Sequence, residues 1–125
     1  MQPVVLLGRS HPVVLPDFAA REEIVAVYAD ASKRGGSAAM RAYGAVLGLC
    51  CPTLAKAAGA DYAAHRFDAL AFGGKVYGYL REKGAAPADV ATAAMPLIVQ
   101  VVEATFPRQE EVDAAMGKSP AGEAP

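Results

Sequence analysis

Apolar residues recur every three or four positions along most of this chain, a spacing that predicts amphipathic helices. Helices are expected at 18–33, 37–49, 66–83, 88–106 and 109–116, with a single helical turn at 54–58. Glycines and prolines, which end helices, separate these segments. We therefore predict a mainly α protein, in which an N-terminal β-hairpin is followed by four to five helices packed as a small irregular bundle. One domain is expected over residues 1–116, with the hairpin in residues 1–16.

The first sixteen residues follow a different pattern, because their aliphatic residues stand in two short runs. Val4–Leu7 and Val13–Leu15 are predicted strands, and Gly8–His11 suits the turn between them. A two-stranded hairpin is marginal in water, so it must dock on helices or pair with another strand. Its open edge is a template for such a strand. The predicted protein-binding edge comprises Val4, Val5, Leu6, Leu7, Val13, Val14 and Leu15.

Single residues predict helix starts and helix contacts. Asp17 suits the N-cap of the first helix and Ser37 that of the second. Gly73, Gly74 and Gly78 each cost about 1 kcal/mol of helix propensity relative to Ala. Since the chain is rich in alanine, we expect close approach of a neighbouring backbone, with Gly74 and Gly78 at a tight helix–helix contact. One side of this predicted helix is shared by Phe67, Leu70, Ala71, Gly74, Tyr77 and Gly78.

Composition narrows the function classes. Twelve basic and thirteen acidic residues give a net charge of -1, so no general attraction to nucleic acid or anionic lipid is expected. The N-terminus lacks a signal-peptide pattern, and the apolar stretch Val90–Val102, which Pro96 interrupts, is shorter than the ~20 residues that span a bilayer. We expect a cytoplasmic protein with no nucleic-acid or membrane partner. Residues 117–125, rich in Gly, Pro, Ala and Ser, are predicted to be a disordered tail.

Cys50 and Cys51 raise the question of metal binding or nucleophilic catalysis. With His11 and His65 they are a conceivable zinc site, and either thiol could pair with His65 as a nucleophile. Zinc ligands are usually spaced by two to four residues, whereas these cysteines are adjacent. A reactive thiolate needs an electropositive setting, which the uncharged segment 47–52 does not supply. We therefore interpret both as small buried core residues.

The densest polar group contains Asp61, His65 and Asp68. Asp61 and His65 could pair at helical spacing, but no nucleophile or phosphate-binding loop accompanies them. The favoured alternative is a capping network in which Asp68 or Asp61 starts the third helix. Tyr43, Tyr62, Tyr77 and Tyr79 lack interleaved basic residues, so core or interface packing is favoured over base stacking. No catalytic residue, cofactor or metal is predicted.

The layout resembles that of small tail assembly chaperones of long-tailed phages and gene transfer agents. The resemblance is carried by the runs Val4–Arg9 and Val13–Pro16, the acidic helix start Phe18–Glu23 and the charged segment Phe106–Val112. Members of that family bind the long tape-measure protein, prevent its aggregation and help recruit tail-tube subunits. The resemblance implies a non-catalytic protein in the bacterial host cytoplasm, with tape-measure and tail-tube proteins as partners.

Other functions stay open beside this leading hypothesis of an assembly chaperone or adaptor, for which a homo-oligomer is one possible form. One alternative is a small phage or bacterial inhibitor or regulatory protein that acts by protein–protein binding. A second is a minor structural component of the virion. A third is a small enzyme that uses the neighbourhood of Asp61, His65 and Asp68.

Overall fold

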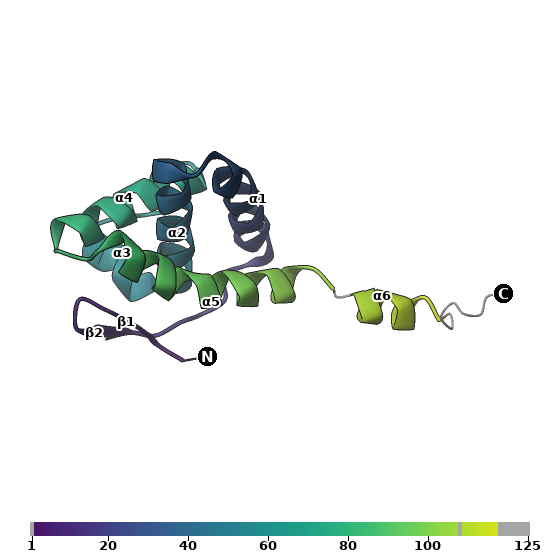
Figure 1. Cartoon of the computed structure of the whole chain (residues 1–125). Helices are drawn as coiled ribbons and strands as arrows, with labels where there is room; N and C mark the ends of the chain where they lie inside the picture. The colour runs from purple at the N-terminus through teal and green to yellow at the C-terminus, as the bar shows by residue number, and fades with distance from the viewer. Residues whose placement is uncertain (1, 108, 118–125) are drawn as a thin grey trace.

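The computed structural model describes residues 2–107 and 109–117 and is a helical bundle with a two-stranded hairpin at its N-terminal end (Figure 1). The elements are β1 (Val4–Leu6), β2 (Arg9–His11), α1 (Phe18–Arg34), α2 (Gly36–Cys50), α3 (Pro52–Ala58), α4 (Ala69–Glu82), α5 (Pro87–Thr105) and α6 (Gln109–Ala115). The predicted mainly α fold with an N-terminal hairpin is confirmed. α6 lies beyond the end of α5 and packs against no other element of the described residues. The tail predicted at 117–125 lies outside those residues, apart from Gly117.

The hairpin is tighter than the sequence predicts. β1 and β2 are antiparallel, with Val4 opposite His11. Leu7 and Gly8 form the whole turn, with φ values of 55° and 74°. Two positive φ values are typical of the type I′ turn, which suits the twist of two-residue hairpins. Because the chain reverses within these two residues, the second strand follows directly after Gly8, and the strand predicted at Val13–Leu15 is wrong.

Residues 13–15 instead connect the hairpin to the helices. The backbone N–H of Val14 donates to the carbonyl oxygen of Cys50 at 2.8 Å, at the end of α2. The hairpin docks through both strands, since β1 lies against α5 and β2 against α3. A hydrogen bond of 2.8 Å joins His11 Nδ1 to the hydroxyl of Thr53 in α3. The expectation that the hairpin must dock on helices is confirmed.

Local signals explain most helix starts. Asp17 caps α1 as predicted, because its carboxylate accepts a backbone N–H of the first turn at 2.9 Å. Asp68 caps α4 in the same way at 3.2 Å, so this helix starts at Ala69 rather than at residue 66. Ser37 is not a cap, because α2 already begins at Gly36.

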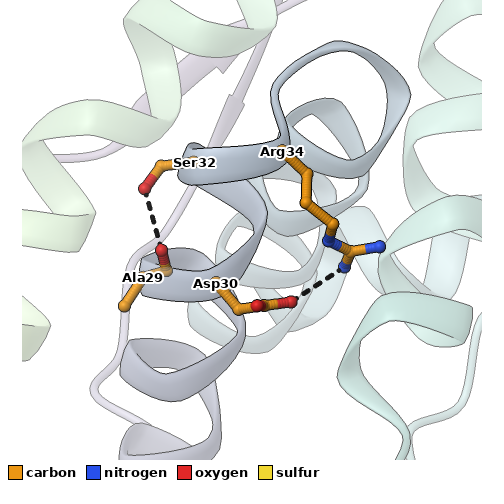
Figure 2. A network of polar contacts seen from close by, with 4 residues as sticks. All are labelled: Ala29, Asp30, Ser32 and Arg34. Carbon is orange, nitrogen blue, oxygen red and sulfur yellow. Dashed lines mark hydrogen bonds and ion pairs between the residues drawn. The ribbon is translucent and has the colours of Figure 1, made fainter.

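The C-terminal end of α1 carries local polar contacts, which Figure 2 shows. Arg34 and Asp30 make an exposed ion pair of 3.1 Å, and the Ser32 hydroxyl donates to the carbonyl of Ala29 at 3.1 Å. Exposed pairs at this helical spacing contribute only ~0.3–0.5 kcal/mol. The stability of the bundle must therefore come mainly from packing.

α2 is the centre of the bundle, because α1, α3, α4 and α5 all pack against it. Its second half is buried almost without interruption, in keeping with Arg41 as its one charged residue. The large, fully buried side chains are Ile24, Val46, Leu47, Cys50, Cys51, Leu54, Phe72, Val76, Leu80, Val90 and Val101. Burial of a large apolar side chain contributes about 1.5–3 kcal/mol, so these residues account for much of the driving force.

The closest helix contact lies between α2 and α4, at Gly44 and Gly73. A Cβ added to Gly44 would collide with the backbone of Gly73, and a Cβ on Gly73 would collide with the backbone carbonyl of Arg41. One turn further along α2, a Cβ on Gly48 would come within 2.6 Å of the Phe72 ring. The two backbones therefore approach to a distance that only glycine allows.

The prediction of a tight contact at Gly74 and Gly78 is wrong. Nothing lies within 4 Å of a Cβ built on Gly78, and the three atoms nearest to one built on Gly74 belong to the Arg41 side chain, the closest at an ordinary contact distance of 3.6 Å. The buried side of α4 consists of Ala69, Phe72, Gly73, Val76 and Leu80. Phe67, expected on the same side as Gly74, is 62% exposed. The helix is thus rotated by about one residue, roughly 100°, from the predicted orientation.

Candidate functional site

A groove of about 600 Å³ runs between β1 and one side of α5. Ligand pockets in proteins have volumes of ~300–1,000 Å³. The lining residues are Gln2, Pro3, Val4, Val5, Leu6, Leu7, Gly8, Gly84, Ala85, Asp89, Thr92, Ala93, Pro96, Leu97 and Gln100. The first part of the predicted edge, Val4–Leu7, therefore lies along the groove.

β1 presents its unpaired edge at Val5. In a hairpin with a two-residue turn, the residues that flank the turn exchange backbone hydrogen bonds, and bonded and non-bonded pairs alternate after them. Val4 and Leu6 therefore bond to β2, whereas the N–H and carbonyl of Val5 point away from it. The side chains alternate as well, since Val4 and Leu6 are buried and Val5 is 65% exposed. Val5 is thus the position at which another strand can pair.

α5 borders the groove with an interrupted helical hydrogen bond and a buried side-chain acceptor that has no partner in the described part of the chain. Pro96 has no backbone N–H, so the carbonyl of Thr92 loses the donor that residue i+4 supplies in a helix. The side-chain Oε1 of Gln100 is buried and has no hydrogen-bond partner in the described part of the chain. Buried polar groups are nearly always hydrogen-bonded. Among the described residues of the lining, Asp89 is the one ionisable residue, and the Arg81 guanidinium lies next to the lining, where it donates to the carbonyl of Ala85 at 2.9 Å.

The turn of the hairpin is strained. Leu7 has a φ of 55°, a left-handed conformation that costs an L-residue roughly 1–2 kcal/mol and that Gly or Asn adopts more readily. Its side chain is 39% exposed and lines the groove. Arg66 and Phe67 have similar φ values of 56° and 59°, and Phe67 lines a smaller hollow beside the start of α1, so strain alone does not select the groove.

A second candidate surface covers the outer side of α5 beside the start of α1. This α5 outer surface consists of the exposed side chains Phe18, Met95, Val99, Val102 and Phe106. α1 runs antiparallel to α5, because Arg21 Nε donates to the Thr105 hydroxyl at 3.2 Å and the Tyr28 hydroxyl donates to Met95 Sδ at 3.7 Å. These exposed apolar side chains therefore lie along two adjacent helices.

By length and composition alone, the stretch Pro87–Ala115 is apolar enough to cross a membrane, and 28% of its most apolar window is buried in the bundle. The structure divides this stretch, because α5 ends at Thr105 and Phe106 is extended, with a φ of -123°. Core helices of soluble proteins meet the same criterion. The expectation of no membrane partner stays a prediction.

Cys50 and Cys51 are free thiols, buried where α2 meets α3. Burial raises the pKa of Cys50 to about 12, with a further contribution from Cys51, and burial raises the pKa of Cys51 to about 11. Such thiols hold almost no thiolate near neutral pH and are poor nucleophiles. The interpretation as buried core residues is confirmed. Among the residues that the structure describes, no group of three or more His, Cys, Asp or Glu could hold a metal ion.

The side chains of Asp61, His65 and Asp68 each have a local partner. Asp61 accepts the N–H of Ala63 at 3.2 Å, and Asp68 caps α4. The His65 ring lies edge-on to the Phe72 ring, with 6.3 Å between the centroids. The capping interpretation is confirmed for Asp68, and this geometry does not favour an acid–base pair.

The tyrosines Tyr43, Tyr62, Tyr77 and Tyr79 are partly buried and pack against the core, as predicted. Tyr62 also lines a smaller hollow of about 380 Å³ beside the start of α1. Burial raises the pKa of Tyr62, and three nearby carboxylates add to this effect. The one buried side-chain atom without a partner in the described residues is in Gln100, beside the larger groove. The larger groove is therefore the stronger candidate site.

Sequence reasoning found one wall of this groove and missed the other. Val4–Leu7 line it, whereas Val13–Leu15 lie outside its lining. The α5 wall was missed because periodicity does not show which side of a helix a hairpin leaves open. Two signals were present in the sequence: Pro96 inside a helical pattern, and Gln100 within an apolar run.

No protein-family model, curated protein or solved structure matches the chain. The resemblance to tail assembly chaperones therefore stays a prediction, and the function is inferred from the groove and the α5 outer surface.

Proposed function

We propose that this protein binds other proteins without catalysing a reaction, as an assembly chaperone or adaptor. The observation that carries the proposal is the groove between β1 and α5, which the unpaired edge of Val5 lines. The α5 outer surface supplies a second contact area. Contiguous exposed apolar patches on soluble proteins mark interaction sites, so both features support binding of a polypeptide.

The chemistry of the other candidate residues supports the same proposal. The thiols of Cys50 and Cys51 are buried and protonated near neutral pH. His65 packs on an aromatic ring, and Asp68 is engaged in capping α4. None of these groups forms a nucleophile with an adjacent base, which is the arrangement that covalent catalysis needs.

Within this class we favour the tail assembly type, on the resemblance in layout. The client would be a tape-measure protein, the second partner a tail-tube subunit, and the protein would act in the host cytoplasm. An inhibitor would instead bind one folded target, and a minor virion component would stay in the finished particle. The three functions therefore differ in what the protein binds and in whether it stays in the finished particle.

The test is co-expression with the tape-measure protein, which the proposal expects to be the longest product encoded just downstream of this gene. We expect a larger soluble fraction of that client and a complex that survives size-exclusion chromatography. Val99→Lys, on the α5 outer surface, should reduce both, because it places a charge among exposed apolar side chains. Ala104→Lys adds the same charge at another exposed position of α5 and should have little effect.

A client that stays insoluble with the wild-type protein, and forms no complex, would contradict the tail assembly proposal. A complex with a single folded protein would favour the inhibitor. Recovery of the protein from purified particles would favour a virion component.

A further inference from the structure

The groove also indicates the chemistry of the segment that it takes, an inference that rests on the proposed function. We propose that the groove between β1 and α5 binds an extended segment of a partner protein, which pairs as a strand with Val5 and places a Lys or Arg side chain beside Asp89.

The strand part of the proposal follows from the two edges of the hairpin. The edge of β2 lies on the side of α3, where His11 is bonded to Thr53, and Pro12, which has no N–H, follows it directly. The edge of β1 lies on the groove, where Val5 offers both an N–H and a carbonyl. Strand addition to such an edge is a common mode of peptide recognition.

The exposed backbone of Val5 favours an extended segment over a helix. A helix uses its own backbone N–H and carbonyl groups internally, so it has none to offer the N–H and carbonyl of Val5. An extended segment has both groups free and can pair with Val5 along the groove.

Charge decides the preferred side chain. The described lining residues include the carboxylate of Asp89 and no Lys, Arg or His, and the Arg81 guanidinium beside the lining is held by the carbonyl of Ala85. A cationic side chain gains from this carboxylate, and an acidic one is repelled by it. Because Asp89 is exposed, water and salt screen the pair, and the gain in affinity should be about two- to fivefold.

The test uses three capped pentapeptides, Thr-Val-Lys-Val-Thr and its variants with norleucine or glutamate at the centre, titrated into the ¹⁵N-labelled full chain. We expect the lysine peptide to shift the amide signals of Val5, Thr92 and Gln100. Norleucine should weaken binding about two- to fivefold, and glutamate should weaken it further. Asp89→Asn should remove the difference between the lysine and norleucine peptides.

The matched control lies on the same hairpin. Val5→Pro removes the N–H at the groove edge and should weaken binding about tenfold. Ser10→Pro removes the outward N–H of the opposite edge, since Ser10 stands across from Val5, and should leave binding within about twofold. Melting curves and circular dichroism check that both variants stay folded.

Three outcomes would overturn the inference. The first is the absence of shifts at the groove amides with millimolar peptide. The second is equal loss of binding in the Val5 and Ser10 variants. The third is a preference for the lysine peptide over the norleucine peptide that Asp89→Asn leaves unchanged. Client solubilisation that persists in any of these cases would leave the proposed function standing and would assign binding to the α5 outer surface instead.

Discussion

Gly44 of α2 lies backbone to backbone against Gly73 of α4. A Cβ on either residue would enter the neighbouring helix, so this pair sets the separation of the two helices. The same approach brings Phe72 and Val76 of α4 against Gly48, where both side chains are fully or almost fully buried. These glycines lower the helix propensity of α2 and α4, but they allow the two helices to pack at their closest distance.

Gly44→Ala should lower the free energy of unfolding by about 1–3 kcal/mol, because overpacking outweighs the better helix propensity of alanine. Gly78→Ala is the matched control, since a Cβ there meets nothing within 4 Å, and it should stabilise by up to about 1 kcal/mol. Urea denaturation of both variants measures the difference. Equal effects would show that helix separation does not depend on Gly44.

Leu7→Asn should raise the free energy of unfolding by up to about 1 kcal/mol, because Asn tolerates the positive φ of the turn better than Leu. Leu7→Ala keeps the backbone strain, removes the same large side chain and should give no such gain. Thermal melts compare the two. If the leucine side chain also serves the groove, both variants should bind the lysine peptide more weakly than the wild type.

The thiols of Cys50 and Cys51 should react slowly with iodoacetamide at pH 8, because pKa values of about 12 and about 11 leave almost no thiolate. Both should react rapidly in urea. Mass spectrometry of the alkylated chain gives the rates. A cysteine introduced at the exposed Ala57 is the control and should react rapidly in the folded protein. Equally fast alkylation of the native cysteines would contradict their burial.

Stability should fall at acidic pH through His11. Burial lowers the pKa of His11 below 6.5, and the charge of Arg9 lowers it further. The unfolded chain then takes up a proton at higher pH than the folded chain does. The contribution of His11 to stability is therefore complete above 6.5 and decreases as pH falls from 6.5 toward the lower, folded-state pKa.

His11→Gln isolates this effect, because glutamine can still hydrogen-bond to Thr53 but does not titrate. Melting temperatures of both proteins are measured between about pH 5 and 8. As the pH falls, the melting temperature of the wild type should decrease relative to that of the variant. Parallel curves would show that His11 is not the titrating group.

The sequence alone was sufficient for features that depend on neighbours in the chain. The helical periodicity located α1 and α2 to within about one residue at each end. Asp17 was recognised as a cap because its carboxylate bonds within the first turn of the helix that follows. The burial of Cys50 and Cys51 followed from the uncharged segment around them. Each of these features depends on residues a few positions apart, so it can be predicted from the order of residues in the sequence.

Only the tertiary structure decided which side of α4 is buried, where β2 lies and what borders the groove. Gly73 and Gly74 differ by one position and have equal propensity, and only the approach of α2 selects Gly73 for the contact. The aliphatic run Val13–Leu15 has the composition of a strand, but the turn at Leu7 closes too early for it to pair with β1. The groove forms between β1 and α5. These two elements are about eighty residues apart in sequence, so only the packing of the folded chain brings them together.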